Sequence, residues 1–180
     1  MRYRAAALFC LAAAGCNPSA PKPTAAPSLL TRPRATPTPL VLKITGYGTA
    51  KQPVHLIQQV HNRVDYDLLA SSYQSNGPQG AARAVFQSAR VTFRDRTGAT
   101  FAATAPQAVV DQAANTVTLT NGVHAHTSSG MTLECTQLVY ERATGMLHGS
   151  GDVVVTDPKG FRATGSSFDS DISLTHMRMQ

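Results

Sequence analysis

One spacing in the sequence is typical of a metal site, and it is formed by His124-Ala-His126. Residues i and i+2 of a β-strand point to the same face, so both imidazoles could bind one ion. Neither neighbouring residue supplies a further ligand, which leaves His148 as the candidate for a third. Two solvated histidines on the polar face of a strand explain the pattern more simply. We therefore predict no metal and no other cofactor.

Nucleophilic chemistry is not indicated either. Of three cysteines only Cys135 lies beyond position 16, and its place in an alternating apolar strand favours a small buried hydrophobe over a reactive thiol. Ser19-Ala-Pro-Lys22 matches S-x-x-K by its letters, but it lies in a proline-rich segment. The G-x-S-x-G, Walker, H-E-x-x-H and dinucleotide motifs do not occur, and the acidic residues fall mostly at turns. We therefore expect no enzymatic activity.

The elements that would position these residues are β-strands in a repeated pattern. Residues 115–127 alternate apolar and polar side chains, and comparable stretches precede and follow them. Gly98, Gly130 and Gly160 open successive segments at spacings near 30 residues, which is typical of stacked supersecondary units. Such a unit is too short for a βαβ crossover and fits two strands and two turns. The sequence thus predicts about ten antiparallel strands in an all-β domain of two facing sheets or a flattened roll.

The inward face of these sheets is the candidate working surface. It is apolar but rich in alanine, which predicts either a groove or two closely spaced sheets. Phe86 falls on the polar side of its strand and Pro106 interrupts another, so both indicate a bulge or an edge. The predicted inward residues are Val85, Val91, Phe93, Phe101, Ala103, Val117, Leu119, Val123, Leu133, Cys135, Leu147, Val153, Val155, Phe161 and Phe168. The last strand, around Ile172, Leu174 and Met177, is predicted to be an open edge that could pair with another sheet.

The N-terminus has the pattern of an export signal. A basic start precedes a short apolar run, which ends at Gly15-Cys16. Cys16 stands in a lipobox-like context and is the candidate lipidation site, and cleavage near Ala14 to give a soluble form is the alternative. Seven of the eleven prolines follow in residues 17–39 and predict an extended linker. The predicted organisation is a signal in 1–16, a linker in 17–40 and a β-domain in 41–180.

The net charge of +6 does not indicate a nucleic-acid partner. Five of the sixteen basic residues precede Val41, and the remaining eleven face ten acidic residues in the predicted β-domain. The domain is nearly neutral, so it lacks the basic surface that nucleic-acid binding requires. The N-terminal basic residues lie where a tether would run close to an anionic membrane surface.

Four consecutive segments carry a resemblance to a known family. They read NTVTLTNGV from Asn115, GMTLECTQLVY from Gly130, GMLHGSGDVVV from Gly145 and GFRATGSSFD from Gly160. As an ordered set they resemble the OstA-like repeat, and with the single N-terminal anchor the chain is similar to the LptC family over about residues 60–180. The resemblance implies a twisted β-jellyroll. Members of the family usually keep an uncleaved transmembrane helix, whereas this chain has a short signal ending at Cys16.

The family resemblance also implies a function. Its members take lipopolysaccharide from an inner-membrane ABC transporter and pass it along an apolar groove to a periplasmic bridging jellyroll protein, which is LptA-like. By this resemblance the partners would be lipopolysaccharide or a related glycolipid, the transporter and the bridging protein. The location would be the periplasm, on the inner membrane through a lipid anchor. The alternative is a structural β-domain that bridges envelope proteins by edge-strand pairing without carrying lipid.

Overall fold

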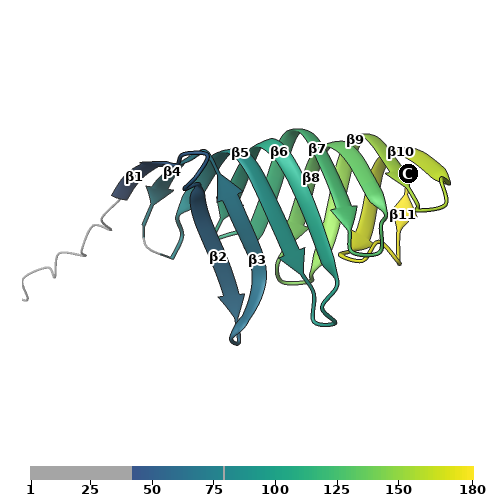
Figure 1. Cartoon of the computed structure of the whole chain (residues 1–180). Coiled ribbons are helices and arrows are strands. Elements are labelled where there is room, and N and C mark those ends of the chain that lie inside the picture. Colours follow the sequence, from purple (N-terminus) through teal and green to yellow (C-terminus); the bar gives the residue numbers. More distant parts are fainter. Residues whose placement is uncertain (1–41, 79) are drawn as a thin grey trace, which may run out of the picture. The chain divides into compact units, whose positions relative to one another are not determined.

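The computed structural model describes residues 42–78 and 80–180, and these residues contain β-strands and no helix (Figure 1). Within them, no helix is long or apolar enough to cross a membrane. The all-β prediction is confirmed. The predicted signal, Cys16 and the proline-rich linker lie outside the described residues. The strands are β1 (Leu42–Tyr47), β2 (Val54–Val60), β3 (Arg63–Ala70), β4 (Ser72–Gly77), β5 (Arg83–Arg94), β6 (Thr100–Asp111), β7 (Thr116–Thr127), β8 (Thr132–Glu141), β9 (Met146–Thr156), β10 (Arg162–Asp171) and β11 (Arg178–Met179).

The strands form one continuous sheet, whereas the sequence pattern predicts two facing sheets or a flattened roll. All pairings are antiparallel, and the order β1-β4-β5-β6-β7-β8-β9-β10-β11 includes every strand except β2 and β3. Strand β3 pairs with the second part of β5, and β2 pairs with β3. Strand β4 pairs with the first part of β5, so β3 and β4 lie one after the other along β5.

A bend crosses the sheet and accounts for this branching. In β6 the inward residues Ala105 and Ala108 are three positions apart instead of two, and Pro106 lies between them. The same spacing separates Cys135 and Leu138 in β8. The register shifts at corresponding points between β6 and β7, β7 and β8, β8 and β9, and β9 and β10. Such irregularities bend a strand and increase its twist.

The bend divides the sheet into two parts. The first half-sheet contains β2, β3 and residues 89–94, 100–105, 123–127, 132–135, 153–156 and 162–165. The second half-sheet contains β1, β4, β11 and residues 83–87, 107–111, 116–120, 137–141, 146–150 and 167–171.

The two half-sheets pack on each other and share one core. Phe93 of the first and Tyr140 of the second are buried with ring centroids 4.5 Å apart. The buried side chains of both half-sheets belong to a single hydrophobic cluster. The architecture is therefore a bent sheet whose halves enclose its apolar face.

The repeat predicted from the glycine spacing corresponds to three hairpins of the first half-sheet. Gly98, Gly130 and Gly160 have φ values of 90°, 89° and 88° and lie in the turns β5–β6, β7–β8 and β9–β10. This left-handed backbone conformation favours glycine. The carboxylates of Asp95 and Asp157 accept backbone N–H groups within two of these turns, which explains acidic residues at turns.

Two predicted inward positions are wrong. Val85 is half-buried while its neighbour Phe86 is 3% exposed in the core, because the strand changes phase at Ser88, whose φ is 50°. Phe161 is 70% exposed, because it belongs to the β9–β10 turn and donates its backbone N–H to Asp157.

The predicted open strand at the C-terminus is also wrong. Ile172 and Leu174 are each 3% exposed and lie in the core, and Met177 packs against it. The chain turns after β10, and only Arg178–Met179 pairs with β10, on the second half-sheet. We call residues 172–180 the C-terminal cap.

Candidate functional site

The inward residues predicted from the sequence form most of the observed core. Apart from Val85 and Phe161, every predicted inward residue of β5 to β10 is at most 6% exposed. They are close together in one cluster that also contains Tyr66, Leu68, Phe86, Leu138 and Tyr140, which the prediction did not include. Their burial is observed, and their role in binding lipid stays a prediction.

Cys135 lies in the core, whereas the three candidate metal-binding histidines are exposed. Burial raises the pKa of the Cys135 thiol to about 11, so it is protonated near neutral pH. His124 and His126 are exposed on the outer face of β7, while His148 lies on the second half-sheet and its Nδ1 is 2.6 Å from the Asp169 carboxylate. Among the described residues, no group of three or more histidine, cysteine or acidic side chains could hold a metal ion.

The core opens at the end of the sheet that carries β1 and β2. A cavity of about 300 Å³ lies between these strands and is lined mainly by apolar side chains. We call it the apolar opening, and its apolar lining residues are Ile44, Val54, Leu56, Tyr73, Ala82, Ala84, Phe86 and Val110. Tyr73 and Phe86 stack with ring centroids 5.8 Å apart, and Phe86 belongs to the buried core. The opening therefore reaches the edge of the buried core at Phe86.

The local sequence explains why this end is open. In β2, Val54 and Leu56 are half-buried while His55 and Ile57 are exposed, so only alternate residues face the interior. Gly46 of β1 lies beneath the Tyr73 ring, where a larger residue would collide with it. In the described part of the chain, β1 pairs only with β4 and β2 only with β3, which leaves one edge of each strand unpaired.

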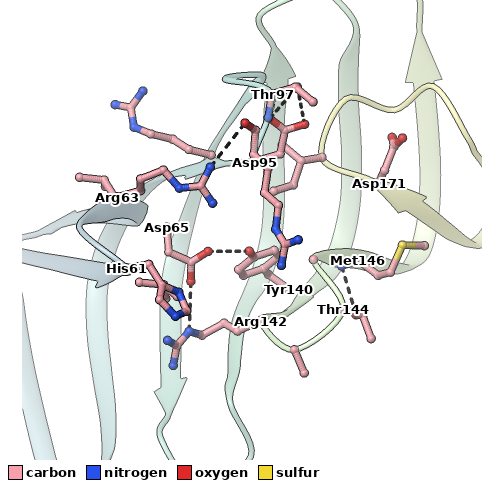
Figure 2. Close-up of a pocket in the computed structure, with 17 residues that line it drawn as sticks. His61, Arg63, Asp65, Asp95, Thr97, Tyr140, Arg142, Thr144, Met146 and Asp171 are labelled. Carbon is pink, nitrogen blue, oxygen red and sulfur yellow. Dashed lines mark hydrogen bonds and ion pairs between the residues drawn. The ribbon is translucent and has the colours of Figure 1, made fainter.

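A polar cluster joins the two half-sheets on the side opposite the bend. The Tyr140 hydroxyl donates to Oδ1 of Asp65 at 3.0 Å, and Arg142 Nε donates to Oδ2 at 3.2 Å. Figure 2 shows the Asp65 carboxylate pointing toward both side chains. Burial raises the pKa of Tyr66 to about 12, and the Arg142 guanidinium lies 6.0 Å from its ring centroid. We call Asp65, Tyr140 and Arg142 the clasp, because it links β3 to β8 and the turn that follows it.

A cleft of about 860 Å³ surrounds the clasp. It is lined by the β2–β3 and β5–β6 turns of the first half-sheet and by the β8–β9 turn and the end of β10 in the second. The sequence pattern predicted neither this cleft nor the apolar opening. In the segment VHLIQQV of β2, apolar residues at alternate positions indicate a strand with one apolar face at the opening. The cleft has no such local pattern, because its residues are far apart in the chain.

No protein-family model and no curated protein matches this sequence, so the comparisons assign it to no family.

Proposed function

We propose that this chain is a lipid-transfer component of lipopolysaccharide export, similar to the LptC family and with a twisted β-jellyroll fold. In this role it takes lipopolysaccharide from an inner-membrane ABC transporter and passes it to a bridging jellyroll protein. It performs no enzymatic reaction. The observation that supports the proposal is the apolar opening, which reaches the core residue Phe86 of a bent all-β sheet and lies beside two strands whose outer edges are unpaired among the described residues.

The physical argument concerns acyl chains. Exposing an acyl chain to water costs about 0.8 kcal/mol per CH₂, so a lipid with several chains needs a continuous apolar path. Inward residues such as Phe93, Leu119 and Leu133 would form that path, and Leu56 and Tyr73 would form its entrance. Because these inward side chains now contact one another, lipid entry requires the half-sheets to separate at the opening.

The unpaired edges support an end-to-end connection. Strands β1 and β2 have six and seven residues, and each has one edge whose backbone donors and acceptors no other described strand pairs with. A partner sheet that paired with both strands would extend the two half-sheets and continue the apolar path. The proposed contact with the partner is therefore at β1 and β2 instead of at Ile172, Leu174 and Met177.

The proposed location is the periplasm, with lipidated Cys16 as an anchor to the inner membrane. Incorporation of labelled palmitate into the wild type, and its loss in Cys16→Ala, is the expected result. Release of an unlabelled soluble wild-type form would instead indicate ordinary signal cleavage.

Photocrosslinking tests lipid carriage. A photoreactive amino acid at Leu56, in the opening, or at Leu119, in the core, is expected to capture lipopolysaccharide in cells. The matched control is Thr118, which neighbours Leu119 on the opposite face of β7. Equal capture at Thr118 and Leu119, or no lipid at Leu56, would contradict the proposal.

A structural role is the second candidate, because the interior is occupied by the chain's own side chains and the edges of β1 and β2 are free. In that case the domain would bridge envelope proteins by strand pairing alone. Crosslinks from the exposed β2 residue Ile57 to a partner sheet, without lipid at Leu56 or Leu119, would favour it.

A further inference from the structure

The cleft around the clasp gathers positive charge from three separate turns. Arg63 follows the β2–β3 turn, Arg94 and Arg96 flank the end of β5, and Arg142 follows β8. His61 and Asn62, with φ values of 49° and 61°, form the tight turn before Arg63. Arg63 donates to the backbone carbonyl of Arg96, which connects the first two of these turns. Four arginines that are distant in the sequence thus line one cleft.

The three carboxylates in the cleft already have hydrogen-bond partners. Asp65 accepts from Tyr140 and Arg142 within the clasp. Asp95 accepts the backbone N–H groups of Thr97 and Ala99 at 2.8 Å. Asp171 accepts the Thr175 backbone N–H at 3.0 Å and also contacts His176. These acidic groups are occupied in holding turns and half-sheets together.

Three of the four arginines are left without a carboxylate partner. Among the described residues, the ion pairs of the cleft involve Arg142 with Asp65, and none involves Arg63, Arg94 or Arg96. Their side chains are exposed, so water currently solvates them. Guanidinium groups bind phosphate oxygens in a bidentate manner, and several of them around one cleft match a phosphate group.

The cleft also contains apolar surface. Val60 and Val64 line it from the first half-sheet, and Met146 and Ile172 line it from the second. An inorganic anion would leave this surface unused, whereas the headgroup region of a phosphorylated lipid presents both a phosphate and adjoining carbon atoms. The mixture of unpaired arginines and apolar residues therefore fits an amphipathic phosphate better than a free ion.

We infer that the cleft is a subsite for the phosphate-bearing headgroup of a lipid, with Arg63, Arg94 and Arg96 binding the phosphate. The inference rests on the proposed lipid-transfer function and adds a second contact to it. The clasp and cleft lie on the side opposite the bend, where the half-sheets meet without strand pairing. A headgroup bound there would stay in water while its acyl chains lie between the half-sheets.

Binding to the purified full chain tests the inference. The probes are dihexanoyl phosphatidic acid, dihexanoyl phosphatidylcholine and inorganic phosphate, each titrated by calorimetry at low salt. The key variant is Arg94→Gln/Arg96→Gln, and the matched control is Arg83→Gln/Arg162→Gln, which removes the same charge from exposed positions outside the cleft. Thermal unfolding of both variants verifies that they fold.

Phosphatidic acid is expected to bind more tightly than phosphatidylcholine, and the cleft variant is expected to weaken it by about tenfold or more. The control variant is expected to keep most of the affinity, and added salt to reduce it. An equal loss in both variants, or equal binding of the two lipids, would overturn the inference. Arginine-dependent binding of inorganic phosphate as tight as that of phosphatidic acid would overturn the assignment to a lipid.

The photocrosslink at Leu56 separates this inference from the proposed function. Lipid capture at Leu56 without any effect of the cleft variant on phosphatidic acid binding would remove the headgroup subsite and leave lipid transfer intact. Phosphate-selective, arginine-dependent lipid binding without capture at Leu56 would retain the subsite and contradict transport through the core.

Discussion

The two ends of the bent sheet are built from similar strands but end differently. At the β1–β2 end, Tyr73 and Leu56 are half-buried around the apolar opening. Both edge strands at this end lack an outer partner in the described residues (Figure 1). At the β10 end, the C-terminal cap places Ile172 and Leu174 in the core and pairs β11 with β10. An apolar interior is thus accessible from one end and closed at the other.

The difference shows that an apolar interior alone does not define a binding site. Residues such as Leu147 and Phe168, near the cap, are as apolar as those near the opening, but they are fully buried. Edge strands are usually protected by charge, by short length or by a covering segment. The cap protects part of β10 in this way, whereas the exposed Ile57 on β2 makes that edge suitable for a partner.

Truncating one isoleucine at each end should give the largest contrast. Ile172→Ala removes a side chain that is 3% exposed and is expected to lower the free energy of unfolding by about 2 to 4 kcal/mol. Ile57→Ala, at a side chain that is 47% exposed, is expected to cost less than about 1 kcal/mol. Urea unfolding with an unchanged m-value measures both. Similar costs would show that the cap is not part of the core.

Adding a methyl group beneath an aromatic ring compares the freedom of the two ends. Gly149 lies beneath the Phe168 ring and Gly46 beneath the Tyr73 ring, so a Cβ at either position would overlap the ring. Phe168 is 1% exposed and has no room to move, so Gly149→Ala is expected to cost about 1 to 3 kcal/mol. Tyr73 is half-buried and can rotate outward, so Gly46→Ala should cost less.

Rates of amide hydrogen exchange show which strands each of the two variants destabilises. In Gly46→Ala, faster exchange should be confined to β1 and β4, whereas Gly149→Ala should affect the strands around the cap. An equal loss of stability in both variants would show that the Tyr73 ring is no freer to rotate than the Phe168 ring.

The C-terminal cap should loosen in acid. Burial opposes ionisation of Asp171, but hydrogen bonds from His176 and Thr175 outweigh it and hold the pKa of this carboxyl well below its usual range. Because the pKa is lower in the folded than in the unfolded chain, ionised Asp171 stabilises the fold above pH about 4. This contribution is lost as the pH falls below that value.

The Asp171→Asn variant isolates the effect from those of other carboxylates. The stability difference between wild type and variant is expected to be constant near neutral pH and to shrink as the pH is lowered from about 5 to 3. Urea midpoints across that range measure it. A difference that does not change with pH would exclude Asp171 as the acid-sensitive group of the cap.

Much of the strand arrangement could be predicted from local pattern. Gly98, Gly130 and Gly160 predicted equivalent turns because few other residues adopt their backbone conformation. The change of phase between Cys135 and Leu138 can be recognised in the sequence, because alternating apolar residues lie on both sides of it. In contrast, the phase change at Ser88 carried no signal, since serine at a positive φ is unusual, and Val85 was therefore assigned in place of Phe86.

Long-range contacts account for the errors that affect function. Ile172 and Leu174 alternate like a strand, but Asp171 accepts the backbone N–H of Thr175 and the chain turns there. The cleft around the clasp could not be predicted, because Arg63 and Arg142 line it together only when the bend brings the half-sheets together. Local periodicity records which side of a strand is apolar, and it contains little information on where two distant turns meet.

A buried hydroxyl near the cap should give the smallest effect, with the opposite sign. Ser170 is fully buried in β10, and its Oγ has no hydrogen-bond partner among the residues that the structure describes. Leaving such a group unpaired costs free energy, so Ser170→Ala is expected to raise the free energy of unfolding by about 1 kcal/mol. Ser167→Ala, at a half-buried position of the same strand, is the matched control and should change little. A loss of stability in Ser170→Ala would show that its hydroxyl is paired in solution, and that the closed end of the core is more polar than the arrangement of the cap indicates.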